Sequence, residues 1–152
     1  MIVDLDIATR KSIPAEALFQ RWVTAAMPEG EHAVVSIRII DRVESAKLNQ
    51  IYRQKTGPTN VLSFPFEVPE GIPNNLLGDL AICAAIVEKE AKEQGKPADA
   101  HWAHIVVHGV LHLRGFKHDQ DAEAEAMEAL EIEILAGLGY PNPYAIEEAP
   151  AT

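Results

Sequence analysis

The chain of 152 residues contains a single cysteine and no long apolar run. Cys83 alone can form neither an internal disulfide nor a thiolate metal cluster, so we expect a reducing, cytoplasmic setting. The longest clean apolar run has eight residues, Leu80 to Val87, whereas a membrane-spanning helix needs about twenty, and we expect no membrane association. No basic stretch precedes Asp4 and Asp6, which argues against a secretory signal peptide.

Basic residues are also scarce, since 13 Lys and Arg stand against 23 Asp and Glu, for a net charge of −10. Such a charge repels phosphate and at first argues against a nucleic-acid partner. The distribution changes this interpretation, because residues 119–152 hold nine of the acids and no Lys or Arg. Residues 1–118 keep 14 acids and all 13 bases, and could still present a basic groove.

Length and an apolar fraction of 47% indicate one globular domain. Hydrophobic periodicity and turn residues predict strands over residues 1–8, 33–40, 60–66 and 76–83. They predict helices over residues 15–27, 44–55, 84–94, 100–114 and 121–138. We therefore expect an α+β fold, a single layered domain with a mixed sheet of about four strands, about five helices and the helix at 100–114 in its centre. The domain is expected to span residues 1–140, and residues 141–152 to form an extended or frayed tail.

Apolar spacing also predicts which faces two of these helices bury. In the helix at 44–55, Leu48, Ile51 and Tyr52 recur at helical spacing. The helix at 121–138 is expected to bury Met127, Leu130, Ile134 and Leu138, and to present its many acids as a solvated outer face.

Three histidines, His108, His112 and His118, are spaced as ligands of one metal ion. His108 and His112 are four residues apart on an expected helix, so both rings leave the same face. Gly115 can adopt the left-handed conformation that reverses the chain and would return His118 to the same ion. Three imidazoles with an open fourth position are typical of catalytic zinc, so we predict one zinc ion per chain, with nickel, copper and iron as alternatives. The simpler alternative is three unrelated histidines on a half-buried helix and its exit.

The same spacing occurs in metzincin proteases, which carry Glu directly after the first histidine as general base. Gly109 occupies this position, so the chain lacks the base of a peptide hydrolase. His101 and His104 extend the histidine stripe along the helix and could support the ligands or contact a polyanion. We favour the simpler interpretation, in which His101 is exposed in the first turn and His104 is partly buried and hydrogen-bonded.

Four motifs stand out between residues 48 and 118: Leu48-Asn49-x-x-Tyr52-Arg53, Pro58-Thr59-Asn60-Val61-Leu62-Ser63-Phe64-Pro65-Phe66, Leu77-Gly78-Asp79-Leu80 and His108-Gly-x-Leu-His112-Leu-x-Gly115-x-x-His118. In these motifs the chain resembles the YbeY family of bacterial endoribonucleases, which are ribosomal RNA maturation factors. The resemblance implies zinc ligands at His108, His112 and His118 and a functionally important arginine at Arg53. Thr56 and Lys117 stand where the family usually has Asp, and neither is a ligand position.

Arg53 lies near the end of the helix at 44–55, where a guanidinium could bind phosphate and stabilise the charge of phosphodiester cleavage. A favourable helix-end charge is the alternative, and the resemblance favours the catalytic role. We expect Arg38, Arg114 and Lys117 to contact RNA. Cys83 is expected to be buried and inert.

The sequence therefore predicts a cytoplasmic, zinc-dependent, single-strand-specific endoribonuclease that acts in ribosomal RNA maturation and small-subunit quality control, as the resemblance implies. Expected partners are single-stranded ribosomal RNA and, through the acidic helix, small-subunit ribosomal proteins, with no dinucleotide cofactor. Water and the ribose 2′-hydroxyl both stay open as nucleophile. Two other functions also stay open: a metallohydrolase of peptides or esters, and a non-catalytic ribosome-assembly factor with a structural zinc.

Overall fold

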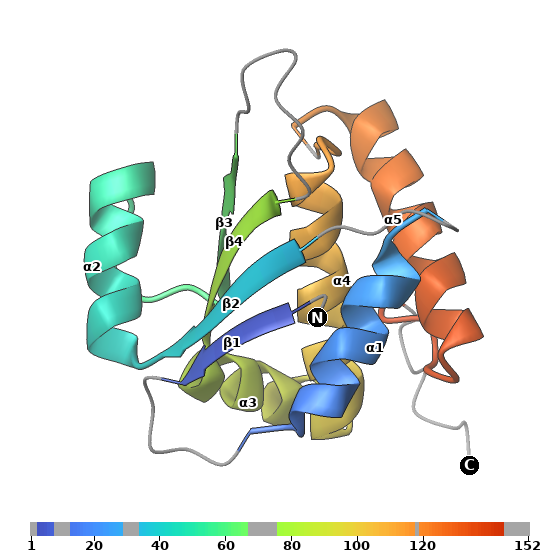
Figure 1. Cartoon of the computed structure of the whole chain (residues 1–152), viewed down its shortest axis with the longest axis horizontal. Coiled ribbons are helices and arrows are strands. Elements are labelled where there is room, and N and C mark those ends of the chain that lie inside the picture. Colours follow the sequence, from blue (N-terminus) through green and yellow to red (C-terminus); the bar gives the residue numbers. More distant parts are fainter. Residues whose placement is uncertain (1–2, 8–12, 29–33, 67–75, 118, 145–152) are drawn as a thin grey trace.

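The computed structural model describes residues 3–7, 13–28, 34–66, 76–117 and 119–144, with side chains described from residue 7 onward. Its strands are β1 (Val3–Ile7), β2 (Val34–Ile40), β3 (Val61–Pro65) and β4 (Leu76–Cys83). Its helices are α1 (Glu16–Ala26), α2 (Arg42–Arg53), α3 (Ala84–Glu93), α4 (Ala98–Leu113) and α5 (Asp121–Gly137). Within these ranges the fold is α+β with four strands and five helices, which confirms the predicted fold class and element order (Figure 1).

The described strands form one mixed sheet in the order β1-β2-β4-β3. β1, β2 and β4 run parallel, and β3 pairs antiparallel with β4 at one edge. Helix α2 lies on one face of the sheet, whereas α1 and α4 lie on the other and α5 packs beyond them (Figure 1). The sheet is therefore covered on both faces, and its edge strand β3 contacts α4 (Figure 1).

Helix α4 occupies the centre of the larger core, as predicted. Ten of its 16 residues are buried, and it contacts α1, α3, α5, β3 and β4. Phe19 stacks edge-to-face on Trp22 and Trp102, with ring centroids 5.4 and 5.7 Å apart. A smaller apolar cluster on the opposite face of the sheet contains Cys83, which is buried as expected. Among the described residues, no helix is long and apolar enough to span a membrane.

The buried face of α2 differs from the apolar spacing in the sequence. Ile51 and Tyr52 are 58% and 59% exposed, whereas Ser45 and Asn49 are buried. The Ser45 hydroxyl donates to the Thr59 carbonyl at 2.9 Å, and the Asn49 amide donates to the Gly57 carbonyl at 2.8 Å. These two polar side chains face inward because they satisfy backbone groups of the loop that leads to β3.

Helix α5 buries Met127 and Leu135 as an apolar stripe, but the residue between them on this stripe is Glu131. Glu131 is fully buried, so the interpretation of the acids of this helix as a wholly solvated face is wrong at this position. The other described acids of α5 are exposed, as expected: Asp121, Glu123, Glu125, Glu128 and Glu133.

Candidate metal centre and groove

Helix α4 presents four histidines along one face, at intervals of one turn: His101, His104, His108 and His112. The ring centroids of successive histidines lie 6.1, 6.1 and 4.6 Å apart. The helix ends at Leu113, and the positive φ of 99° at Gly115 lets the following Phe116 N–H donate back to the Leu111 carbonyl at 3.0 Å. The predicted left-handed glycine is therefore confirmed, and the chain turns directly below His112.

The Nε2 atoms of His108 and His112 face each other at 3.1 Å. Two nitrogens bound to one tetrahedral zinc at 2.0–2.1 Å are separated by about 3.3 Å. Both rings also line the same groove and are only partly buried. The pair therefore fits a metal ion that a substrate can reach.

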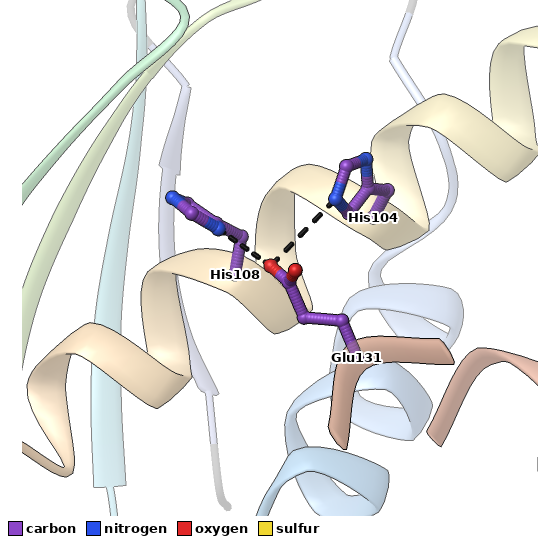
Figure 2. Close-up of side chains that lie close together, drawn as sticks. All are labelled: His104, His108 and Glu131. Atoms are coloured by element: carbon purple, nitrogen blue, oxygen red, sulfur yellow. Dashed lines mark hydrogen bonds and ion pairs between the residues drawn. The ribbon is translucent and has the colours of Figure 1, made fainter. Parts of the chain in front are cut away.

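The other ring nitrogen of His108 contacts a buried carboxylate. His108 Nδ1 lies 2.5 Å from Glu131 Oε1, and His104 Nε2 lies 3.6 Å from the same oxygen. Figure 2 shows the carboxylate reaching from α5 toward both imidazoles of α4. The Tyr144 hydroxyl donates to the second oxygen, Oε2. Glu131 therefore links α4, α5 and the segment that follows α5.

Two opposing effects set the protonation of this cluster. Burial raises the pKa of Glu131, but hydrogen bonds from His104, His108 and Tyr144 outweigh it and lower the pKa to about 2. Burial and the nearby Glu131 carboxylate raise the pKa of Tyr144. Burial lowers the pKa of His104 more than the Glu131 carboxylate raises it. The cluster thus favours an ionised carboxylate and a protonated phenol.

Two donor sets for a metal ion share His108. In one set, His104, His108 and Glu131 each offer one atom, and these atoms lie within 4.8 Å of one another. In the other, His108 and His112 offer the facing Nε2 atoms. His118, the third predicted ligand, lies outside the described residues, but its neighbours Lys117 and Asp119 both line the groove with His108 and His112.

The groove beside the histidines has a volume of about 870 Å³ and gathers residues from α2, β3, α4 and the turn that follows α4. It places Arg53, at the end of α2, on the same surface as His108, His112 and Lys117. Its other lining residues include Tyr52, Asn60, Ser63 and Phe64. The structure therefore brings the predicted catalytic arginine and two predicted metal ligands to one cavity, and their roles stay predictions.

The other two arginines expected to contact RNA lie elsewhere. Arg114 donates to the Ala26 carbonyl at 2.8 Å, and its guanidinium lies 5.2 Å from the Phe116 ring centroid. Arg38 on β2 pairs with Glu44 at 2.8 Å. Neither lines the groove, so their contacts with RNA stay predictions that the geometry does not support.

His101 is buried rather than exposed, which corrects the sequence interpretation. It is 3% exposed, and its Nε2 lies 3.0 Å from Glu90 Oε1. Burial raises the pKa of Glu90, but hydrogen bonds from His101 and Asn60 outweigh it and lower the pKa. His104 is partly buried and hydrogen-bonded, as expected, with Nε2 3.1 Å from the Tyr144 hydroxyl.

Sequence reasoning missed Glu131 and Tyr144. Glu131 does carry a sequence signal, because it lies four residues after Met127 and four before Leu135, in the middle of an apolar stripe. Tyr144 lies within the predicted tail, at residues 141–152. The described part of that segment places Tyr144 against Glu131 and His104, whereas residues 145–152 lie outside the described residues.

A family model and a curated relative of this chain carry the same description. A family model described as Endoribonuclease YbeY matches residues 5–139. A curated Endoribonuclease YbeY from Methylococcus capsulatus is 62% identical over 145 residues, which cover 94% of this chain and 96% of that protein. The solution structure of a Thermotoga maritima protein matches with a TM-score of 0.58 and 22% identity, over 95% of this chain and 99% of that one. At this identity the structural match supports the fold alone.

Proposed function

The chain belongs to the YbeY endoribonuclease family, and we propose that it cleaves single-stranded RNA with a zinc ion held by His108, His112 and His118. The observation that carries this proposal is the groove that holds Arg53 together with the facing imidazoles of His108 and His112. A polyanionic substrate in this groove would meet a guanidinium and a metal centre at once. This pairing suits phosphodiester cleavage, in which negative charge develops on the phosphate.

Each residue of the proposed site has a separate task. His108 and His112 offer Nε2 lone pairs, and His118 is expected to complete the set. A zinc ion held there would supply Lewis-acid chemistry to a phosphodiester group. Arg53 would bind phosphate oxygens through its planar fork and stabilise the charge that grows on them. Lys117 adds a positive charge to the same groove.

An exposed aromatic side chain in the groove supports a preference for single strands. Tyr52 is 59% exposed, lines the groove and packs edge-to-face on Phe64, with ring centroids 5.0 Å apart. Phe66, directly after β3, is 48% exposed. Unpaired bases stack on such rings, whereas the bases of a duplex are already stacked and cannot reach them.

The biological setting rests on the family resemblance. We place the enzyme in ribosomal RNA maturation and small-subunit quality control, in the cytoplasm, with residues 1–140 as its catalytic domain. The exposed acids of α5 are the proposed docking surface for a basic small-subunit ribosomal protein.

The test is a cleavage assay with purified protein, with and without a chelator, followed by re-addition of zinc. The substrates are a single-stranded RNA, the same RNA in a duplex, an unstructured peptide and a small ester. We expect chelator-sensitive cleavage of the single strand alone. Chelator-sensitive cleavage of the peptide or ester would favour another metallohydrolase, and stoichiometric zinc without any cleavage would favour a non-catalytic assembly factor.

A further inference from the structure

Glu131 of α5 occupies a fully buried position behind the proposed metal ligand His108. We propose that Glu131, held in place by Tyr144, is a positioning residue that orients the His108 imidazole so that its Nε2 faces His112. The metal-binding part of this inference rests on the proposed zinc site. The orientation of the ring does not, because it concerns contacts within the chain.

The hydrogen-bond chemistry of the carboxylate assigns the proton on His108. An ionised carboxylate has acceptors only, and the Tyr144 hydroxyl already donates to Oε2. The His108 nitrogen that lies 2.5 Å from Oε1 must therefore be a donor, so Nδ1 carries the hydrogen. In a neutral ring this leaves the lone pair on Nε2.

The lone pair assigned in this way points at the second ligand. His108 Nε2 lies 3.1 Å from His112 Nε2, on the side of the ring away from Glu131. The opposite tautomer would put a hydrogen between the two ligand nitrogens and a lone pair against a carboxylate. Glu131 therefore disfavours the metal-incompetent form, as carboxylates behind ligand histidines do in metalloproteins.

Tyr144 makes the segment after α5 part of this arrangement. Its hydroxyl contacts Glu131 and also lies 3.1 Å from His104 Nε2. The neighbouring Pro143 carbonyl accepts from Lys96 Nζ at 2.7 Å, which anchors the segment to the turn before α4. The tyrosine thus occupies Oε2 of the carboxylate and leaves Oε1 for His108.

The competing assignment is that Glu131 binds the metal directly with His104 and His108, since these residues also lie close enough together. In that case the metal would sit on His108 Nδ1. The two assignments differ in which nitrogen of one ring carries the hydrogen or the metal, and this difference is directly measurable.

The first experiment records the two-bond ¹⁵N–¹H spectrum of the histidine rings in the full chain, without metal and with zinc. We expect His108 to carry its hydrogen on Nδ1 without metal and to bind zinc through Nε2. A hydrogen on Nε2 in the metal-free chain, or zinc on Nδ1, would overturn the inference without any variant.

The second experiment measures zinc affinity by competition with a chromophoric chelator. Glu131→Gln keeps an acceptor but loses the charge, and Glu131→Leu removes the acceptor. We expect a loss of about 10- to 100-fold for the glutamine variant, a larger loss for the leucine variant and a smaller one for Tyr144→Phe. Glu133→Gln, an exposed change on the same helix, and Tyr140→Phe, at a partly buried tyrosine, are the matched controls and should bind zinc like the wild type.

Failure of the inference and failure of the proposed function give different results. Wild-type zinc affinity in folded Glu131 variants would overturn the positioning role and leave the zinc site intact. If the Glu131 variants do not fold, the zinc affinity of Tyr144→Phe and the histidine spectrum of the wild type still test the positioning role. A wild-type chain that binds no zinc but holds the hydrogen on Nδ1 would overturn the zinc proposal and confirm the orientation by Glu131.

Discussion

Gly109 of α4 approaches Leu80 of β4 so closely that a Cβ atom at residue 109 would lie 2.8 Å from the leucine Cδ2 atom. This contact lets α4 pack directly on the sheet, beside β3 and β4. The neighbouring His108 then shares a groove with Ser63 and Phe64 of β3. The glycine that replaces a protease base therefore has a packing role of its own.

The first prediction compares two helical glycines. Gly109→Ala should destabilise the chain by up to about 2 kcal/mol, because overpacking costs about 1 to 3 kcal/mol and helix propensity returns about 1 kcal/mol. Gly137→Ala, where a Cβ atom meets nothing within 4 Å, should stabilise it by up to about 1 kcal/mol. Urea unfolding measures both changes. Equal effects at the two positions would contradict the close approach of α4 to β4.

A second prediction concerns peptide hydrolysis. Gly109→Glu should not create a protease, because a side chain at residue 109 points at Leu80. The substitution also adds no group that would stabilise the oxyanion of peptide hydrolysis. We expect a destabilised chain without peptidase activity, measured with an unstructured fluorogenic peptide. Chelator-sensitive peptide cleavage by the wild type would overturn the preference for RNA.

The third prediction concerns metal content. Purified protein should contain about one zinc ion per chain, and His112→Ala should lose most of it, since one of the two facing Nε2 ligands is removed. Elemental analysis after gel filtration measures the content. Arg53→Ala serves as a control that removes a groove residue but no ligand, and it should retain zinc. Tight stoichiometric zinc in a chain without His108, His112 and His118 would refute the assignment.

Local patterns predicted most of this fold, and the exceptions share one cause. Strand β4 and the Gly115 turn follow from residues close in sequence, and both are confirmed. The partners of the buried His101 and Glu131 could not be predicted in this way, because each partner lies on another element, Glu90 on α3 and His108 on α4. Buried polar groups are specified by tertiary hydrogen bonds, which periodicity does not report.

The exposure of Ile51 and Tyr52 has a related origin. Their helical spacing resembles that of a buried stripe, but α2 turns Ser45 and Asn49 inward to bond the following loop. The displaced Tyr52 then lines the groove beside Arg53. Tyr52, which breaks the expected burial pattern, therefore marks the candidate site. The sequence alone could propose Arg53 but not the residues that line the groove around it.

A fourth prediction uses the pH dependence of the Glu90 pair. The folded-state pKa of Glu90 lies below its ordinary value of 4.5, so its stabilising effect is present above that value and is lost as the pH falls through the folded-state pKa. Glu90→Gln should therefore cost about 1 kcal/mol at pH 7 and less in acid. Urea unfolding from pH 7 to 3 measures this, with the exposed Glu93→Gln on the same helix as control. A pH-independent difference would contradict an ionised, hydrogen-bonded Glu90.

The fifth prediction separates catalysis from binding at Arg53. Arg53→Ala should keep the fold and the zinc, because Arg53 is exposed and is not a ligand, yet it should slow RNA cleavage about a hundredfold or more. Arg53→Lys should recover little of this loss, because an ammonium does not reproduce the two parallel hydrogen bonds of a guanidinium. Single-turnover rates at saturating protein measure the effect without a contribution from affinity.

Arg42→Ala, at the opposite end of α2, removes the same charge outside the groove and should cleave at the wild-type rate. If Arg53 is only a helix-end charge, both Arg53 variants would cleave normally and lose at most about 0.5 kcal/mol of stability. Normal cleavage by a zinc-loaded Arg53→Ala chain would therefore leave the histidines without the cationic partner that the groove assigns to them.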